Sequence, residues 1–224
     1  MCSLYSFRKT ADETRALLKY LEQPQFPPRE HVHPASPMAI VRAGNNGARH
    51  FALVRWGFVP SWAKAVQAQP FINARSETVY EKASFKNAIR RRRCLIPADG
   101  FYEWQEVGEK RKQAWFIHRA EDQLFAFGGI WEHWLGADGS ELETAAMLTI
   151  ESNALIANIH DRSPVVIQPQ DYERWLSLDE QVQDLLKAPP DDFWFMEKVE
   201  SPRARKPHSP SPPQPLPKQQ MDLL

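Results

Sequence analysis

The second residue of the chain is a cysteine, and this position gives it chemistry that an internal cysteine lacks. Aminopeptidases remove Met1 when the next side chain is small, which would leave Cys2 with a free α-amine beside its thiol. The reference pKa values of these two groups are about 8 and about 8.5, so the amine is partly neutral near neutral pH. Such an aminothiol condenses with an aldehyde to an imine, and the thiol then closes a stable thiazolidine ring. The alternative is that Cys2 simply follows the start codon.

Three later segments carry polar side chains in apolar surroundings, as acid–base chemistry requires. Asn73 and Arg75 follow an apolar stretch, Glu103 stands between two aromatic residues, and an acid and a base follow His160. Burial against aromatic rings would raise the pKa of Glu103 and let it exchange protons near neutral pH. Plain structural interpretations remain open: a turn residue for Asn73, half of an ion pair for Arg75, a surface charge for Glu103 and a helix C-cap for His160.

Several motifs of nucleotide and metal chemistry are absent from the sequence. It contains no glycine-rich phosphate loop, dinucleotide fingerprint, paired-histidine zinc motif or Gly-x-Ser-x-Gly elbow, and its nine glycines are scattered. These absences argue against an ATPase, a nicotinamide oxidoreductase and a zinc hydrolase. We therefore expect no metal and no nucleotide or other cofactor.

The composition is that of a globular protein in a reducing compartment. Of the 224 residues, 42% are hydrophobic and 11% are aromatic, which excludes a fully disordered chain. The two cysteines, Cys2 and Cys94, exclude a disulfide scaffold. No apolar run approaches the ~20 residues of a membrane span, and the first residues lack the apolar core of a signal peptide. We expect a cytoplasmic protein, nucleoid-associated if bacterial, with no membrane partner.

The elements that must position these residues are mostly strands. Thr10-Ala11-Asp12-Glu13 is typical of a capping box, and it precedes leucines at helical spacing. Residues 80–92 predict a second helix, Ser152 predicts the cap of a short helix reaching His160, and the proline-rich residues 24–37 predict a loop. Strands are predicted at residues 38–43, 50–59, 165–167 and 193–199, and residues 94–105, 114–119, 124–134 and 145–150 are β-rich in composition. Because short turns join them without regular βαβ alternation, we expect one mainly antiparallel α+β domain over residues 1–200.

The last 24 residues differ from this domain in composition and charge. Residues 201–224 contain seven prolines and predict a disordered tail. This tail has four basic residues and one acidic residue, a net charge of +3, whereas residues 1–200 have 24 basic and 27 acidic residues, a net charge of −3. A negative body can still bind a polyanion where its basic groups cluster.

Five blocks, in this order, resemble those of the SOS-response-associated peptidase (SRAP) family, the abasic-site processing proteins. They are the Met1-Cys2 start, WGFVPSW at 56–62, NARSET at 73–78, RCLIPADGFYEW at 93–104 and HDRSP at 160–164. The resemblance runs from Met1 to about residue 200. It implies a barrel-like β core flanked by short helices, and we expect the protein to be a monomer. It also implies a groove for single-stranded DNA and covalent capture of abasic sites by the N-terminal cysteine, a lyase-type Schiff-base chemistry that protects the site.

The resemblance implies a catalytic role for four of the matching positions. Cys2 matches the nucleophile, and Asn73 matches the residue that orients both this cysteine and the abasic sugar. Glu103 matches the acid/base beside the Cys2 amine. His160 matches the group that helps to open the sugar ring.

The same resemblance implies a set of DNA-binding residues. Arg75 matches a phosphate-binding arginine, and a planar guanidinium suits this role. By the same resemblance Asn73 contacts the abasic nucleotide, and we assign Trp62 and Arg162, which lie in two of the matching blocks, to DNA binding.

The sequence departs from the family pattern in two places. Ser3-Leu4 stands where the family has Gly-Arg, and HVHP at 31–34 replaces Asn-x-x-Pro. We expect both departures to affect DNA affinity and groove shape more than the chemistry.

Two other functions remain open from the sequence. The chain could be a cysteine peptidase or N-terminal-nucleophile hydrolase, which the family name suggests and which would include removal of Met1. It could also be a non-enzymatic single-strand binding module, with aromatic residues stacking on bases and Arg90–Arg93 on phosphates, although charge placement at a helix C-terminus explains these arginines equally well. A hydrolase turns over, whereas a cross-linker ends as one adduct per chain.

Overall fold

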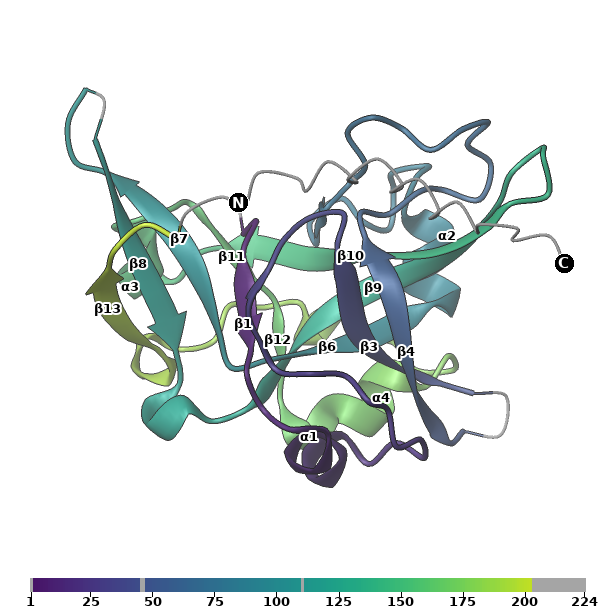
Figure 1. Ribbon diagram of the computed structural model, residues 1–224, viewed down its shortest axis with the longest axis horizontal. Coiled ribbons are helices and arrows are strands. Elements are labelled where there is room, and N and C mark those ends of the chain that lie inside the picture. The colour runs from purple at the N-terminus through teal and green to yellow at the C-terminus, as the bar shows by residue number, and fades with distance from the viewer. Residues whose placement is uncertain (1, 45–46, 110, 203–224) are drawn as a thin grey trace, which may run out of the picture.

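The computed structural model describes residues 2–44, 47–109 and 111–202. Its strands form two sheets, and the short helices lie around them (Figure 1). The strands are β1 (Tyr5–Phe7), β2 (Arg29–Val32), β3 (Pro37–Ala43), β4 (Arg49–Trp56), β5 (Asn73–Arg75), β6 (Arg93–Ala98), β7 (Gly100–Glu106), β8 (Lys112–His118), β9 (Phe125–Leu135), β10 (Glu141–Glu151), β11 (Arg162–Pro164), β12 (Val166–Ile167) and β13 (Phe195–Val199). The α-helices are α1 (Ala11–Leu18), α2 (Lys86–Arg91), α3 (Ala154–Ala157) and α4 (Tyr172–Leu176). Single 3-10 turns are η1 (Ala120–Asp122), η2 (Pro169–Asp171), η3 (Gln183–Leu185) and η4 (Asp191–Phe193).

The larger sheet closes on itself as a barrel. Its strand order is β10-β4-β3-β6-β9, and β9 pairs with β10 again, from Glu141 opposite Leu135 to Met147 opposite Gly129. Strand β10 runs parallel to β4 and β5, whereas the other pairings of this sheet are antiparallel. The structure thus confirms the predicted α+β class and the mainly antiparallel, barrel-like β core.

The smaller sheet has the order β13-β8-β7-β1-β2, and its pairings are all antiparallel. It packs beside the barrel, with β7, β8 and β13 on the left of Figure 1. The two sheets are joined in the chain at Asp99, which separates β6 from β7. The segment at residues 94–105, predicted to be β-rich, is confirmed as such but forms two strands, because the chain changes sheets at Asp99.

Helix α1 forms where local signals predicted it. Thr10 is its N-cap, and both hydrogen bonds of the capping box with Glu13 are present. The second predicted helix is much shorter, because residues 76–85 form turns and only Lys86–Arg91 is helical. The cap of α3 is Asn153, whose side chain accepts from the Ile156 amide, instead of Ser152. The predicted loop at 24–37 contains β2, which finds a partner in β1.

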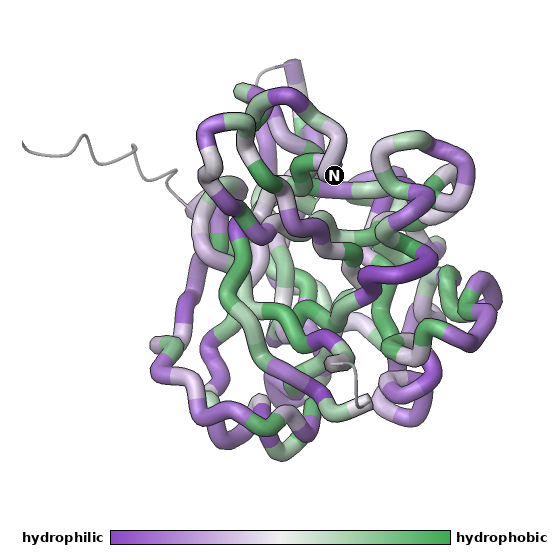
Figure 2. The backbone as a smooth tube through the Cα atoms, turned by 90° about the vertical axis from the view of Figure 1, so that its right-hand side faces the viewer, coloured by the Kyte–Doolittle hydropathy of each residue, from purple (hydrophilic) through white to green (hydrophobic). Residues whose placement is uncertain are grey.

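Apolar side chains fill the barrel and the space between the sheets. Figure 2 shows the hydrophobic segments gathered inside the molecule and the hydrophilic segments on its outside. One buried cluster surrounds Trp56, Phe127 and Met147, and a second surrounds Trp175 and Ile89. In the part of the chain that the structure describes, no helix is long and apolar enough to cross a membrane. The predicted disordered tail lies outside the described residues, apart from Ser201 and Pro202.

Candidate functional site

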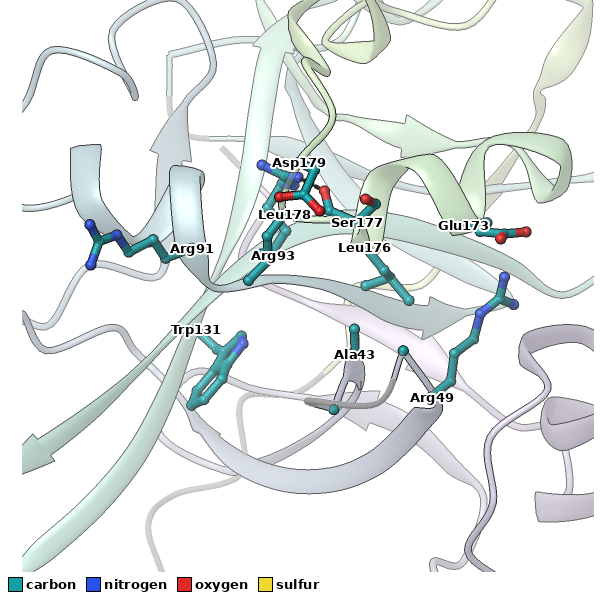
Figure 3. A pocket seen from close by; sticks show the side chains of 12 residues that line it. Ala43, Arg49, Arg91, Arg93, Trp131, Glu173, Leu176, Ser177, Leu178 and Asp179 are labelled. Atoms are coloured by element: carbon teal, nitrogen blue, oxygen red, sulfur yellow. Dashed lines mark hydrogen bonds between the residues drawn. The ribbon is translucent and has the colours of Figure 1, made fainter.

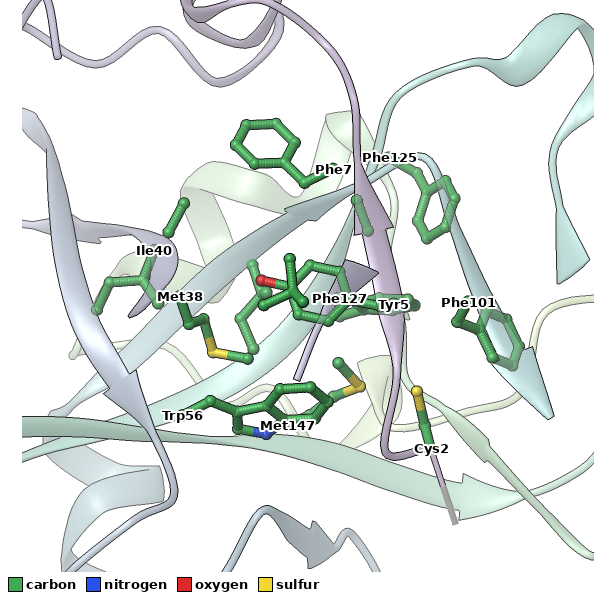
Figure 4. Close-up of a cluster of buried hydrophobic side chains, with 14 of the residues drawn as sticks. Cys2, Tyr5, Phe7, Met38, Ile40, Trp56, Phe101, Phe125, Phe127 and Met147 are labelled. Atoms are coloured by element: carbon green, nitrogen blue, oxygen red, sulfur yellow. The ribbon is translucent and has the colours of Figure 1, made fainter. Parts of the chain in front are cut away.

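Cys2 lies three residues before the start of β1 and is fully buried in the first core cluster (Figure 4). Its thiol donates to the carbonyl of Leu4 at 3.6 Å. Burial raises the pKa of the Cys2 thiol well above its usual range, and the nearby Glu103 carboxylate raises this pKa further. The thiol is therefore held in its protonated form.

Asn73 reaches Cys2 from a strand 71 residues further along the chain. It is the first residue of β5, which pairs with β10 through Asn73 opposite Met147. Its side-chain amide donates to the Cys2 carbonyl at 2.8 Å. Its Oδ1 is buried, and no partner for this oxygen exists among the described residues. One end of Asn73 thus holds the backbone of Cys2, and the other end presents an acceptor in a buried setting.

Glu103 lies on β7 and is only 2% exposed. Burial raises its pKa to about 7, and the charge of Asp161 adds to this increase. The effect of Glu103 on the Cys2 pKa places the two side chains close enough to interact electrostatically. A buried carboxyl group with this pKa exchanges protons readily at neutral pH, as the sequence analysis predicted.

His160 lies after α3, where the Arg162 amide donates to its Nδ1 at 3.0 Å. In neutral imidazole this contact makes Nδ1 the acceptor, so the ring proton is on Nε2. Burial lowers the pKa of His160, although Asp161 Oδ1 lies 2.8 Å from Nδ1 and opposes this decrease. Because Asp161 is 85% exposed, solvent weakens its charge, and we take burial as the dominant effect.

Glu103 and His160 open onto one pocket. A cavity of about 370 Å³ is lined by Glu103, His160, Trp104 and Lys112. An adjoining cavity of about 400 Å³ shares three of these residues and extends the pocket along the molecule toward Asp161. The structure therefore places two of the four predicted catalytic residues, Glu103 and His160, in one pocket. It links the other two directly, since Asn73 donates a hydrogen bond to Cys2, and Cys2 interacts electrostatically with Glu103.

The predicted DNA-binding residues differ in whether they are exposed or engaged by other side chains. Arg75 ends β5 and is exposed, with no ion-pair partner in the described part of the chain. Arg162, by contrast, makes a bidentate ion pair with Glu77 at 2.6 and 2.8 Å. Trp62 is 61% exposed in the connection between β4 and β5. Arg75 and Trp62 are thus available to a ligand, whereas Arg162 is committed to Glu77.

Sequence reasoning did not assign three residues that the structure places at or near the site. Trp104 and Lys112 line the pocket with Glu103 and His160. Thr149, on the same face of β10 as Met147, is fully buried, and its hydroxyl has no partner among the described residues. The sequence contains no signal for Lys112 or Thr149, because each becomes part of the site only through strand pairing.

A larger cavity of about 620 Å³ lies elsewhere, between β3, β9 and α4 (Figure 3). Arg93 lines it, but its guanidinium donates to the carbonyls of Ile89, Trp175 and Ser177. The neighbouring Arg92 forms an ion pair with Glu132 at 2.7 Å. The interpretation of residues 90–93 as a phosphate-binding run is therefore wrong for these two arginines, whose role is structural. In the described ranges, no group of three His, Cys, Asp or Glu side chains is arranged to hold a metal ion.

Comparisons with known proteins show which family this chain resembles. The family model described as SOS response associated peptidase (SRAP) matches residues 1–202. The chain is 34% identical over 183 residues to abasic site processing protein YoqW of Bacillus subtilis (strain 168), covering 79% of this chain and 80% of that protein. It is 30% identical over 176 residues to abasic site processing protein HMCES of Rattus norvegicus, covering 63% of this chain and 50% of that protein.

Solved structures show the same fold. A crystal structure of a protein from Bacteroides thetaiotaomicron superimposes with a TM-score of 0.81 at 23% identity, covering 89% of this chain and 93% of that one. A protein from Bordetella bronchiseptica gives a TM-score of 0.77 at 25% identity, covering 89% of this chain and all (100%) of that one. Because the family model spans nearly all the residues that the structure describes, this chain belongs to the SOS response associated peptidase (SRAP) family.

Proposed function

We propose that this protein captures abasic sites in single-stranded DNA covalently, through Cys2 after Met1 has been removed. The observation that carries the proposal is the hydrogen bond from Asn73 to the Cys2 carbonyl, which holds the aminothiol beside Glu103. Relatives named abasic site processing proteins support the choice of substrate. An abasic deoxyribose is the aldehyde source that such an aminothiol requires.

The sugar must open before it can react, because it is mostly a closed hemiacetal. In ring opening, the C1′–O4′ bond breaks and the C1′ hydroxyl becomes the aldehyde. We assign the proton lost from this hydroxyl to the Glu103 carboxylate, and the proton gained by O4′ to the imidazolium form of His160. The lowered pKa of His160 makes this imidazolium a stronger acid than an ordinary one.

Capture then follows in two bond-forming steps. The neutral Cys2 amine adds to C1′, and protonated Glu103 returns its proton to the hydroxyl that leaves as water, which produces an iminium ion. The thiol sulfur then bonds to C1′, its proton passes to Glu103, and the iminium nitrogen receives the electron pair of the C=N bond. The buried Asn73 Oδ1 is suited to accept a hydrogen bond from the Cys2 amine and so to aim its lone pair. A positioned acid/base typically contributes about 10²–10⁴-fold to such a rate.

A hydrolase mechanism fits these features less well. A cysteine peptidase attacks with a thiolate, whose formation requires a lowered thiol pKa. Burial instead raises the pKa of Cys2. The aminothiol mechanism does not meet this difficulty, because the amine attacks first and the thiol loses its proton only as it adds to the iminium carbon.

The test is the intact mass of the protein after incubation with single-stranded DNA that contains one abasic site. We expect a denaturation-resistant adduct with the mass of the chain lacking Met1, plus the DNA, minus one water. Cys2→Ala should form no such adduct, whereas Cys94→Ala, which removes the other buried thiol, should form it. An adduct of unchanged yield in Cys2→Ala would refute the proposal.

A further inference from the structure

The two residues to which the proposed mechanism assigns the proton transfers belong to different parts of the fold. Glu103 lies on β7 in the smaller sheet, whereas His160 lies in the connection between α3 and β11, a strand of the larger sheet. An acid and a base act on one sugar only if their spacing is held constant. We propose that Gln105 is a positioning residue that sets this spacing, by tying β7 to the end of α3. The inference rests on the proposed function and deepens it.

Gln105 shares a face of β7 with Glu103. The two residues are two positions apart on the strand, and side chains of a strand alternate between its faces. Trp115 of β8 stands opposite Glu103 in the pairing of β7 with β8, and its indole nitrogen donates to Gln105 Oε1 at 3.1 Å. Because Trp115 engages the oxygen of the Gln105 amide, the nitrogen of this amide is left to donate elsewhere.

The nitrogen of this amide reaches the segment that carries His160. Gln105 Nε2 donates to the Asn158 carbonyl at 2.9 Å, across 53 positions of the chain. Asn158 is the C-cap of α3, and one residue separates it from His160. Gln105, Asn158 and His160 also line the same cavity of about 400 Å³. The side chain of Gln105 is therefore a bridge between the strand that carries Glu103 and the connection that carries His160.

The turn from Asn158 to His160 transmits this contact to the imidazole. The His160 amide donates to the Ile156 carbonyl at 3.0 Å, which closes the backbone around Asn158 into a turn. On the far side of the ring, the Arg162 amide donates to Nδ1 at 3.0 Å. The imidazole thus has a backbone anchor on each side, and a movement of Asn158 relative to β7 would change the distance from His160 to Glu103.

A purely stabilising role of Gln105 is the alternative. Its hydrogen bond to Asn158 joins two neutral groups near the surface, and such a bond contributes little to stability. Helix α3 is also attached at its start, where the Asn153 side chain donates to the Pro189 carbonyl at 3.0 Å. Loss of the Gln105 bridge should therefore leave α3 folded and release only the end that leads to His160.

The experiment measures single-turnover rates of adduct formation at a series of concentrations of abasic single-stranded DNA. Gln105→Met keeps the length of the side chain and removes both polar groups of the amide. We expect its maximal rate to fall by up to about 10²-fold, since a misplacement of about 1 Å has this effect, with the half-saturating DNA concentration unchanged. Gln113→Met is the matched control, because Gln113 is paired with Gln105 on β8 but donates to the carbonyls of Ala114 and Val199 instead. It should keep both values.

A second background distinguishes positioning from stabilisation, because positioning acts through His160. In His160→Ala, which lacks the imidazole, Gln105→Met should cause no further decrease in rate, whereas a structural role would make the two decreases multiply. Circular dichroism at the assay temperature verifies that each variant is folded.

Three results would overturn the inference: a wild-type rate in Gln105→Met, a decrease of equal size with and without His160, or a wild-type rate in His160→Ala. They differ from failure of the proposed function, in which the unmodified chain forms no adduct through Cys2.

Discussion

At the scale of single residues, the site depends on burial that disfavours charge. Cys2 is fully buried and Glu103 is 2% exposed, and burial is the largest cause of the raised pKa of both groups. A neutral thiol and a carboxyl group that titrates near pH 7 suit a reaction in which protons move at every step. The hydrogen bond from Asn73 fixes the third component, the backbone of Cys2, without adding a charge.

The pH dependence of adduct formation should report Glu103. Ring opening needs the Glu103 carboxylate, whose pKa is about 7, and the imidazolium form of His160, whose pKa is lowered, so the wild-type rate should increase with pH as the carboxylate forms and decrease again as His160 loses its proton. Glu103→Gln should be slower by about 10²–10⁴-fold and should lack this increase. Rates on abasic single-stranded DNA between pH 5 and pH 9 measure the effect, with the exposed Glu106→Gln as control. A Glu103→Gln profile that matches the wild type would remove Glu103 from the mechanism.

The same residue should make the fold less stable at higher pH. Its pKa is raised from 4.5 to about 7 on folding, so its favourable contribution is complete below 4.5 and is lost as pH rises through 7. Glu103→Gln stays neutral and should escape this loss, which amounts to roughly 3 kcal/mol at most. Denaturant unfolding at pH 5 and pH 8 measures this effect. The unfolding free energy of the variant, relative to that of the wild type, should be larger at pH 8 than at pH 5. An identical difference at both pH values would contradict the prediction.

At the scale of elements, the three-residue strand β1 must hold Cys2 in place. It pairs with β2 and β7, and a buried carboxylate at the junction of the two sheets anchors it. Asp99 accepts hydrogen bonds from the Ser6 hydroxyl at 2.6 Å, from the Arg8 side chain at 2.9 Å and from the Arg8 amide. These contacts attach the chain on the C-terminal side of Cys2 to the point where β6 continues into β7, which carries Glu103.

Asp99→Asn should therefore weaken both the fold and the reaction. The side-chain amide of asparagine has one oxygen that accepts hydrogen bonds, whereas the carboxylate of Asp99 has two. One of the donors on Ser6 or Arg8 therefore loses its acceptor at this buried position. We expect a loss of roughly 2–3 kcal/mol in unfolding free energy, since hydrogen bonds to charged groups contribute about this much. Adduct formation should also slow at a temperature where the variant is folded. Asp138→Asn, in an exposed turn, is the control. Wild-type stability in Asp99→Asn would show that β1 is anchored by its strand pairing alone.

At the scale of the whole molecule, charge is separated along the chain. The two sheets that hold the site belong to a body of net charge −3, and the last 24 residues carry +3. DNA binding by such a body must rely on a few local cations, of which Arg75 is exposed and without an ion-pair partner in the described ranges. Salt should therefore weaken binding, but with a slope that corresponds to only a few phosphate contacts.

Arg75→Gln should lower the salt slope of single-strand binding by about 0.7, with little change in preference among base sequences. Arg174→Gln on α4, an arginine paired with Asp184, is the control for loss of one positive charge. The measurement is binding of undamaged oligonucleotides of several sequences at a series of salt concentrations. A marked change in base preference with an unchanged slope would assign Arg75 to base readout instead.

Local features of the chain could be predicted from sequence because they depend on neighbours. The capping box at Thr10 and Glu13 specifies the start of α1, and continuous runs of apolar residues lie in β3 and β9. Family blocks also identified Cys2 and Glu103 as candidates. By contrast, β2 was missed because the prolines on either side of it favour a loop, and only pairing with β1 makes it a strand.

Tertiary structure decided which of these residues meet and what charge they carry. Asn73 contacts Cys2 across 71 positions, and Lys112 reaches the pocket only because β8 pairs with β7. The aromatic neighbours of Glu103 suggested that its pKa is raised, but the burial that raises it exists only in the folded chain. The sequence by itself determined the reactive groups and the local elements, since those are properties of side chains and of short-range hydrogen bonds. The fold decided their distances, their exposure to water and hence their protonation, since these depend on contacts between segments far apart in the chain.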